Sequence, residues 1–148
     1  FGSGLASDRF GILFQNRGAG FSLEEGHPNE LGPGKRPLHT IIPAMLARDG
    51  RVTMPFGVMG GGYQPTGHAR LVTNLEDFGM DLQAAIDAPR SFAAPESLRL
   101  ERGHDPAAAA ALAAMGHRVR EADAPLGGAQ AIIIGPDGVL EGASDPRK

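Results

Sequence analysis

Short apolar runs that end at glycine, proline or aspartate predict most of the β-structure of this chain. Asp49-Gly50 separates two such runs and is a strong hairpin signal. The tetrapeptide Gly135-Pro136-Asp137-Gly138 separates a second pair. The predicted strands are Gly11–Asn16, which we expect to be buried, and Thr40–Arg48, Arg51–Met59, Ala129–Ile134 and Val139–Ala143.

Helical spacing of apolar residues between these hairpins predicts a first helix. Thr66 is expected to cap it and Gly79 to end it. Its apolar stripe is expected to consist of Ala69, Val72, Leu75 and Phe78.

Two shorter helices are predicted further along the chain. Asp81 is expected to start one, with Leu82, Ala85 and Ile86 at helical spacing and Pro89 as its end. Asp105-Pro106 provides an N-cap and a proline at the first helical position, and an alanine-rich run then continues to Met115. Alanine has high helix propensity but little surface to pack, so we expect this helix to be peripheral.

The order of these elements, β, ββ, αα, β, α, ββ, predicts an α+β fold with helices on an antiparallel or mixed sheet. No internal repeat or domain boundary is visible, so residues 1–148 are expected to form a single domain. The segment 17–37 has no periodicity and is rich in glycine, proline and charge. Long loops of this kind inside a domain are more often functional than idle.

Composition narrows the possible function classes. The 14 basic and 17 acidic residues give a formal charge of −3, so nothing favours nucleic acid as a partner. No cysteine is present, which excludes disulfides, thiolate metal sites and a cysteine nucleophile. The 22 glycines and 12 prolines make up about 23% of the chain, roughly twice the usual ~12%. No apolar run approaches the ~20 residues of a membrane helix, so no membrane partner is expected, while the compartment (cytoplasmic, periplasmic or extracellular) stays open.

The most informative chemical feature is the run Phe56-Gly57-Val58-Met59-Gly60-Gly61-Gly62, in which a strand leads into glycines and then into a helix. Exposed N–H groups at such a turn can stabilise negative charge. An enzyme that attacks an acyl carbon needs such donors for the oxyanion. A tight connection in which side chains do not fit is the structural alternative. A P-loop is not indicated, because no Lys-Ser/Thr pair follows the glycines.

Three polar residues are further candidates. Arg17 follows the predicted first strand, where its guanidinium can bind a carboxylate through two N–H donors. His39 and Thr40 lie at the start of the next predicted strand, and His39 is as readily structural as catalytic. The five histidines lack ligand spacing, so no metal or other cofactor is expected, and no G-x-S-x-G nucleophile elbow is present. These residues do not form a complete catalytic set.

Five segments, in register along the whole chain, resemble the small subunit of the gamma-glutamyltransferases. They are Gly11–Arg17 with Phe21-Ser22, Gly34–Leu38, Met59–Gly61, Asp81–Arg90, and Gly135–Gly138 with Gly142–Arg147. The resemblance implies an N-terminal nucleophile hydrolase with a four-layer αββα sandwich, made by self-cleavage of a precursor. It also implies a small-molecule amide substrate and a large subunit from the same precursor as partner.

In that family the nucleophile is a threonine freed at the small subunit's N-terminus, with its own α-amino group as base. Because this chain begins at Phe1, the resemblance places the threonine upstream and implies that the chain alone is inactive. It places the oxyanion-hole pair on Gly60 and Gly61. The two hydroxyl residues that bind the substrate's α-carboxylate correspond to His39 and Thr40, of which only Thr40 retains a hydroxyl.

Two positions depart from the family pattern. The family's glutamine and aspartate, the latter binding the substrate's α-amino group, correspond to Arg17 and Gly20. Loss of that carboxylate costs an ammonium group about 1.5–3 kcal/mol of charge-assisted hydrogen bonding. The hypothesis is therefore a gamma-glutamyltransferase-like amidase or acyltransferase. The alternatives are a glutaryl or cephalosporin acylase-like hydrolase, a non-catalytic anion-binding module, and a scaffold domain.

Overall fold

The computed structural model describes residues 2–147 and has an α+β fold, as predicted from the sequence. The chain divides into a first unit up to Ile41 and a second unit from Ile42 onward. Within the described residues, the elements are the 3₁₀ helices η1 (Arg17–Gly20) and η2 (Gly61–Tyr63), the helices α1 (Gln64–Glu76), α2 (Leu82–Asp87) and α3 (Pro106–Ala114), and the strands β1 (Ala44–Arg48), β2 (Arg51–Met59), β3 (Ser91–Ala94), β4 (Ser97–Leu100), β5 (Val119–Glu121), β6 (Gly128–Ile134) and β7 (Leu140–Ser144). The expectation of a single domain stays a prediction.

The first unit consists of loops, η1 and isolated β-bridges. The predicted buried strand Gly11–Asn16 is wrong: Leu13 forms a single antiparallel bridge with Ala6, and the whole segment is exposed. Gly11 turns the chain back on itself with a φ of 64°, and no further strand lies beside the bridge within this unit. A short apolar run without neighbouring strands cannot extend into a ladder.

The second unit is built on a four-stranded sheet of order β1-β2-β6-β7, in which every neighbouring pair is antiparallel. Both predicted hairpins are present. At the first turn, Asp49 and Gly50 have φ values of 50° and 75°, as a tight primed turn requires. β1 begins at Ala44 rather than Thr40, and Pro43, which lacks an N–H donor, directly precedes it.

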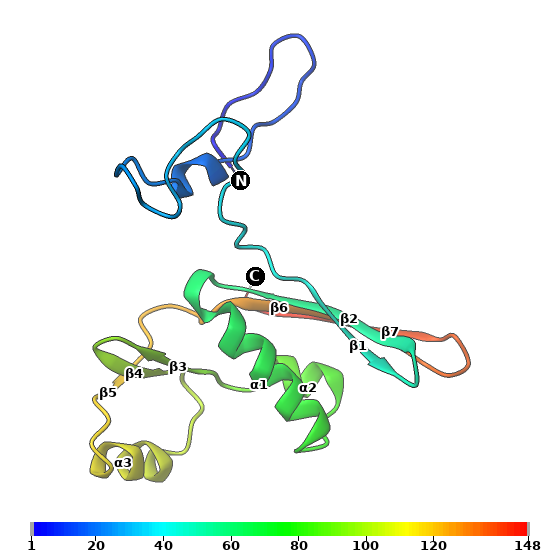
Figure 1. The fold of residues 1–148 in the computed structure, drawn as a ribbon. Coiled ribbons are helices and arrows are strands. Elements are labelled where there is room, and N and C mark those ends of the chain that lie inside the picture. The colour runs from blue at the N-terminus through cyan, green and yellow to red at the C-terminus, as the bar shows by residue number, and fades with distance from the viewer. Residues whose placement is uncertain (1, 148) are drawn as a thin grey trace. The chain divides into compact units, whose positions relative to one another are not determined.

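Helices α1 and α2 lie on one face of this sheet (Figure 1). Alternate residues of β2 point toward them and are buried, namely Met54, Phe56 and Val58. The core is completed by Leu71, Leu82, Ala85, Ile86, Leu126, Ala129 and Ala131, together with Tyr63 of η2. The predicted start of α2 at Asp81 is confirmed, since its side chain accepts a 2.8 Å hydrogen bond from the amide of Ala84.

The predicted cap of α1 is wrong, and its predicted apolar stripe is confirmed at two of four positions. The helix begins at Gln64 with Tyr63 as N-cap, and Thr66 lies inside its first turn. Pro65 accounts for the earlier start, because proline fits the first helical turn. The fully buried residues are Gly67, Leu71 and Asn74. Of the predicted stripe, Val72 and Leu75 are half-buried and pack against the core, whereas Ala69 and Phe78 are exposed.

A second sheet, of order β3-β4-β5, holds three short strands. β3 and β4 form a hairpin, and β5 pairs with β4 in parallel after α3. The sequence predicts only one strand before α3 and none at β5. A three-residue strand such as Val119–Glu121 is too short for a periodic pattern. The predicted α3 is confirmed, with Asp105 as N-cap and no buried residue.

Candidate functional site

The glycine run after β2 forms a sharp turn that only glycine adopts readily. Gly60 has a φ of 136° and Gly61 a φ of 58°, and η2 follows directly. Both glycines are exposed, and within residues 2–147 neither amide N–H donates a hydrogen bond to the sheet or to a turn carbonyl. A turn of this kind presents main-chain donors to a group outside the ladder.

Gly60 packs directly against Gly127, which comes just before β6. A Cβ on Gly60 would lie 2.8 Å from the Cα of Gly127, and a Cβ on Gly127 would lie 2.2 Å from the carbonyl oxygen of Met59. Both positions therefore require glycine because the two backbones meet. The sequence analysis missed Gly127, although the pair Gly127-Gly128, two residues after Pro125, is itself a turn signal.

A buried ion-pair network holds the segment that leads to Gly127. Arg90 and Asp145 form a 2.5 Å ion pair, and their side chains are 6% and 0% exposed. Arg90 also donates to the carbonyl of Leu126, and Asp145 accepts from the amide of Ala129. Two of the five sequence segments that carry the resemblance, those around Arg90 and Asp145, thus meet in space.

Glu101 and Arg147 extend this network. The Glu101 carboxylate accepts a 2.7 Å hydrogen bond from the amide of Leu126 and pairs with Arg147. Burial opposes ionisation of Glu101, but the hydrogen bonds from Arg147, Leu126 and Arg90 outweigh it and lower the pKa of this carboxyl. Burial likewise opposes ionisation of Asp145, yet donors from Arg147, Ala129 and Arg90 lower its pKa. The network therefore fixes both the N–H and the carbonyl of Leu126.

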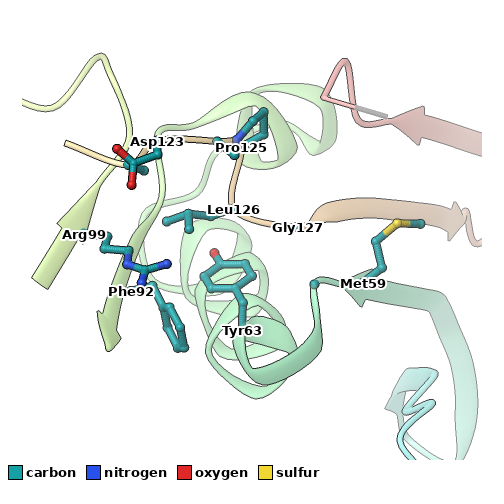
Figure 2. A pocket seen from close by; sticks show the side chains of 11 residues that line it. Met59, Tyr63, Phe92, Arg99, Asp123, Pro125, Leu126 and Gly127 are labelled. Atoms are coloured by element: carbon teal, nitrogen blue, oxygen red, sulfur yellow. The ribbon is translucent and has the colours of Figure 1, made fainter. Parts of the chain in front are cut away.

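The end of β2, the glycine turn with η2, the second sheet and the segment 122–127 line a hollow of about 350 Å³ (Figure 2). Its lining residues come from these elements and are Met59, Gly60, Tyr63, Phe92, Arg99, Ala122, Asp123, Ala124, Pro125, Leu126 and Gly127. The sequence analysis identified only Gly60 among them. The ring of Tyr63, one of these residues, is edge-on to that of Phe92 at 5.7 Å between centroids.

The predicted substrate-binding residues lie in the first unit. The guanidinium of Arg17 donates a 2.5 Å hydrogen bond to the hydroxyl of Thr40, so these two residues are brought together. His39 is exposed and lies, like Thr40, outside any strand. The carbonyl of Gly20 accepts a hydrogen bond from the side chain of Asn29. Arg17 and Thr40 thus form a small cationic, hydroxyl-bearing cluster that suits a carboxylate.

Residues 2–147 contain neither a membrane-spanning helix nor a cluster of metal ligands. No helix in this range has the length and apolar character that crossing a bilayer requires. In the same range, no group of three or more histidine or carboxylate side chains is arranged to hold a metal ion.

Comparison with known proteins places this geometry in context. The family model described as gamma-glutamyltranspeptidase matches residues 1–148. The chain belongs to the gamma-glutamyltranspeptidase family. The chain is 43% identical over 157 aligned residues to the oxamate amidohydrolase proenzyme of Klebsiella pneumoniae, covering 99% of this chain but 30% of that protein. It therefore spans about a third of the length of this relative.

Solved structures of the family share the fold. The gamma-glutamyltranspeptidase of Pseudomonas nitroreducens, complexed with L-DON, superposes with a TM-score of 0.81 at 29% identity, covering all of this chain and 84% of the other. The cephalosporin acylase of Bacillus halodurans superposes with a TM-score of 0.83 at 42% identity, covering 93% of this chain and 26% of the other. Both transpeptidases and acylases of the family are thus similar to this chain.

Proposed function

We propose that this chain provides the oxyanion-stabilising part of an amidase or acyltransferase of the gamma-glutamyltranspeptidase family. The observation that carries the proposal is the turn at Gly60 and Gly61. In the described part of the chain, the amide N–H groups of these two glycines donate no hydrogen bond to the sheet, and their positive φ values end the extended conformation of β2. Each well-placed donor to an oxyanion is worth about 3 kcal/mol of transition-state stabilisation.

The proposed reaction uses a threonine that lies outside this chain, in a more N-terminal part of the protein. Its hydroxyl oxygen attacks the amide carbon, and the hydroxyl proton passes to a base. The carbonyl oxygen becomes an oxyanion that accepts hydrogen bonds from Gly60 and Gly61. Collapse breaks the carbon–nitrogen bond, the amine leaves with a proton, and water or another amine then takes the acyl group from the ester.

The acyl group is proposed to carry a carboxylate and no α-amino group. Arg17 and Thr40 present a cation and a hydroxyl side by side, which suits a carboxylate and repels an ammonium. Gly20 offers no carboxylate for an amine. The relative from Klebsiella pneumoniae is named for oxamate, an amide with a carboxylate and no α-amine.

The partner is proposed to be the remainder of the same precursor. One face of the sheet β1-β2-β6-β7 bears α1 and α2, while Met45 and Ile132 are 69% and 42% exposed. An αββα sandwich would place a second sheet on the face of β1 and β6 that these residues mark. Exposed apolar side chains in mid-strand are typical of a surface that another element covers.

The test is an assay of the complete precursor, after processing, on γ-glutamyl and glutaryl anilides. We expect a higher kcat/KM for the glutaryl compound than for the γ-glutamyl compound. Arg17→Gln is expected to raise kcat/KM for the γ-glutamyl compound relative to the glutaryl compound, because that variant removes the repulsion of the ammonium group. His27→Gln, an exposed change in the same unit, serves as control. A strong preference for the γ-glutamyl compound that Arg17→Gln leaves unchanged contradicts the proposed acyl specificity.

A further inference from the structure

The hollow beside the glycine turn contains a buried polar atom that no protein group satisfies. Tyr63 is 2% exposed, and among the described residues its hydroxyl has no hydrogen-bond partner. A buried hydroxyl without a partner costs about 1–3 kcal/mol. Burial also raises the pKa of Tyr63, an effect that the nearby Arg90 partly offsets, so the hydroxyl keeps its proton and remains a donor.

A cation without an ion-pair partner lines the same hollow. Figure 2 shows the guanidinium of Arg99, from β4, turned toward Tyr63 and Leu126. In the part of the chain that the structure describes, Arg99 forms no ion pair, and Asp123 on the rim does not come within ion-pair distance of it. The other positive side chains near the hollow, Arg90 and Arg147, are neutralised by Asp145 and Glu101.

We propose that this hollow binds the amine portion of the amide substrate through a carboxylate which that portion carries, held by Arg99 and the hydroxyl of Tyr63. This inference rests on the proposed function. Gly60 lines the hollow and also belongs to the proposed oxyanion turn, so the hollow adjoins that turn.

The rest of the lining defines the class of ligand. Met59, Phe92, Pro125 and Leu126 provide apolar walls, so a carboxylate on a small apolar body fits better than a polar sugar or a phosphate ester. A volume of about 350 Å³ is sufficient for an aminobenzoate or a short peptide. Asp123 also lines the hollow, and its negative charge opposes a second carboxylate on the ligand.

The experiment compares two anilides with the same acyl group, one released as 4-nitroaniline and the other as 5-amino-2-nitrobenzoate. In the complete processed enzyme, Arg99→Gln is expected to raise KM for the carboxylated anilide about tenfold, because a charge-assisted contact is lost. The kcat for that anilide, and both kcat and KM for the plain anilide, are expected to stay nearly unchanged. Arg120→Gln is the matched control. Arg120 lies on β5 directly opposite Arg99 in the strand register, but it does not line the hollow. The proposal is overturned if Arg99→Gln raises KM equally for the two anilides. It is also overturned if Arg99→Gln and Arg120→Gln raise KM equally for the carboxylated anilide.

Tyr63→Phe provides a second variant that tests ligand contact rather than folding. Since the hydroxyl has no protein partner, its removal is expected to leave the urea midpoint unchanged or higher. If the hydroxyl binds the carboxylate, the variant also raises KM for the carboxylated anilide alone, by about fivefold. An unchanged KM with unchanged or higher stability means that the hydroxyl does not contact the ligand, which contradicts the proposal.

Calorimetry with free 5-amino-2-nitrobenzoate separates this inference from the proposed function. Binding that Arg99→Gln weakens and Arg120→Gln does not supports the subsite even if neither anilide is cleaved, in which case the proposed function fails alone. If the enzyme instead cleaves both anilides with the same KM and fails to bind free 5-amino-2-nitrobenzoate, the enzyme assignment stands and the proposed subsite is wrong.

Discussion

The two units of this chain differ in what holds their backbone. None of residues 2–41 is buried, and this unit depends on loop hydrogen bonds such as the one between Arg17 and Thr40. The second unit has a contiguous apolar core and, beside it, a buried ion-pair network. The glycine turn at Gly60 belongs to this second unit, and Gly127, against which it packs, precedes a core strand.

This difference has a chemical meaning. Oxyanion donors must be fixed in place before the charge develops, because reorientation during the reaction would cancel their benefit. The proposed donors lie at the end of β2, whose inner face is buried. The proposed acyl-binding residues lie in η1 and a loop of a unit in which none of the described residues is buried, so substitutions there do not disturb a core.

The largest expected effect comes from breaking the buried network. Asp145→Ala leaves the guanidinium of Arg90 buried without its charge partner, and we expect unfolding free energy to fall by about 3–5 kcal/mol. Urea titration followed by circular dichroism measures this. Glu76→Ala, which removes the exposed ion pair with Arg48, is the control and should cost no more than about 1 kcal/mol. Equal losses in the two variants would mean that the network does not stabilise the second unit.

A matched pair of truncations sharpens the contrast between the units. Ile86 in α2 is 0% exposed, whereas Leu13 in the first unit is 76% exposed. In the 148-residue chain, Ile86→Ala is expected to cost about 2–4 kcal/mol and Leu13→Ala less than about 0.5 kcal/mol. Denaturant midpoints of both variants give the comparison. A loss for Leu13→Ala as large as that for Ile86→Ala would contradict the view that residues 2–41 lack a core.

A smaller effect is expected in the acid range. The pKa of Glu101 is lowered in the folded chain below its ordinary value of 4.5, so the carboxylate contributes stability above that pH. This contribution is lost as the pH falls through the lowered folded pKa. The stability difference between the parent chain and Glu101→Gln should therefore be constant near neutrality and shrink below about pH 4.5. A difference that is independent of pH down to the acid transition would contradict this assignment.

Local signals were sufficient for much of the second unit. Asp49-Gly50, Asp81 and Asp105-Pro106 are turn and cap residues whose effect does not depend on distant contacts, and the elements that they define are present. Thr66 failed as a cap because Pro65 favours an earlier start of α1. Gly11–Asn16 failed as a strand because an apolar run carries no information about whether a neighbouring strand exists.

In the candidate site, too, some features could be predicted from local sequence and others could not. The turn at Gly60 and Gly61 is visible in sequence because consecutive glycines directly after a strand predict a sharp turn with exposed amides. Arg99, Tyr63 and Gly127 come from three separate segments and are brought together only by the sheets and by the network around Arg90. No local pattern predicts that juxtaposition.

The most direct test of the central claim compares two glycines with the same backbone requirement. Gly61 and Gly79 have φ values of 58° and 62°, and a Cβ at either position would meet no atom within 4 Å. Alanine at each should therefore cost a similar ~1 kcal/mol of stability. In the complete processed enzyme, the account predicts that Gly61→Ala lowers kcat about tenfold or more through misplaced donors, while Gly79→Ala leaves kcat unchanged. Equal kcat values for the two variants would contradict a role of this turn in stabilising an oxyanion.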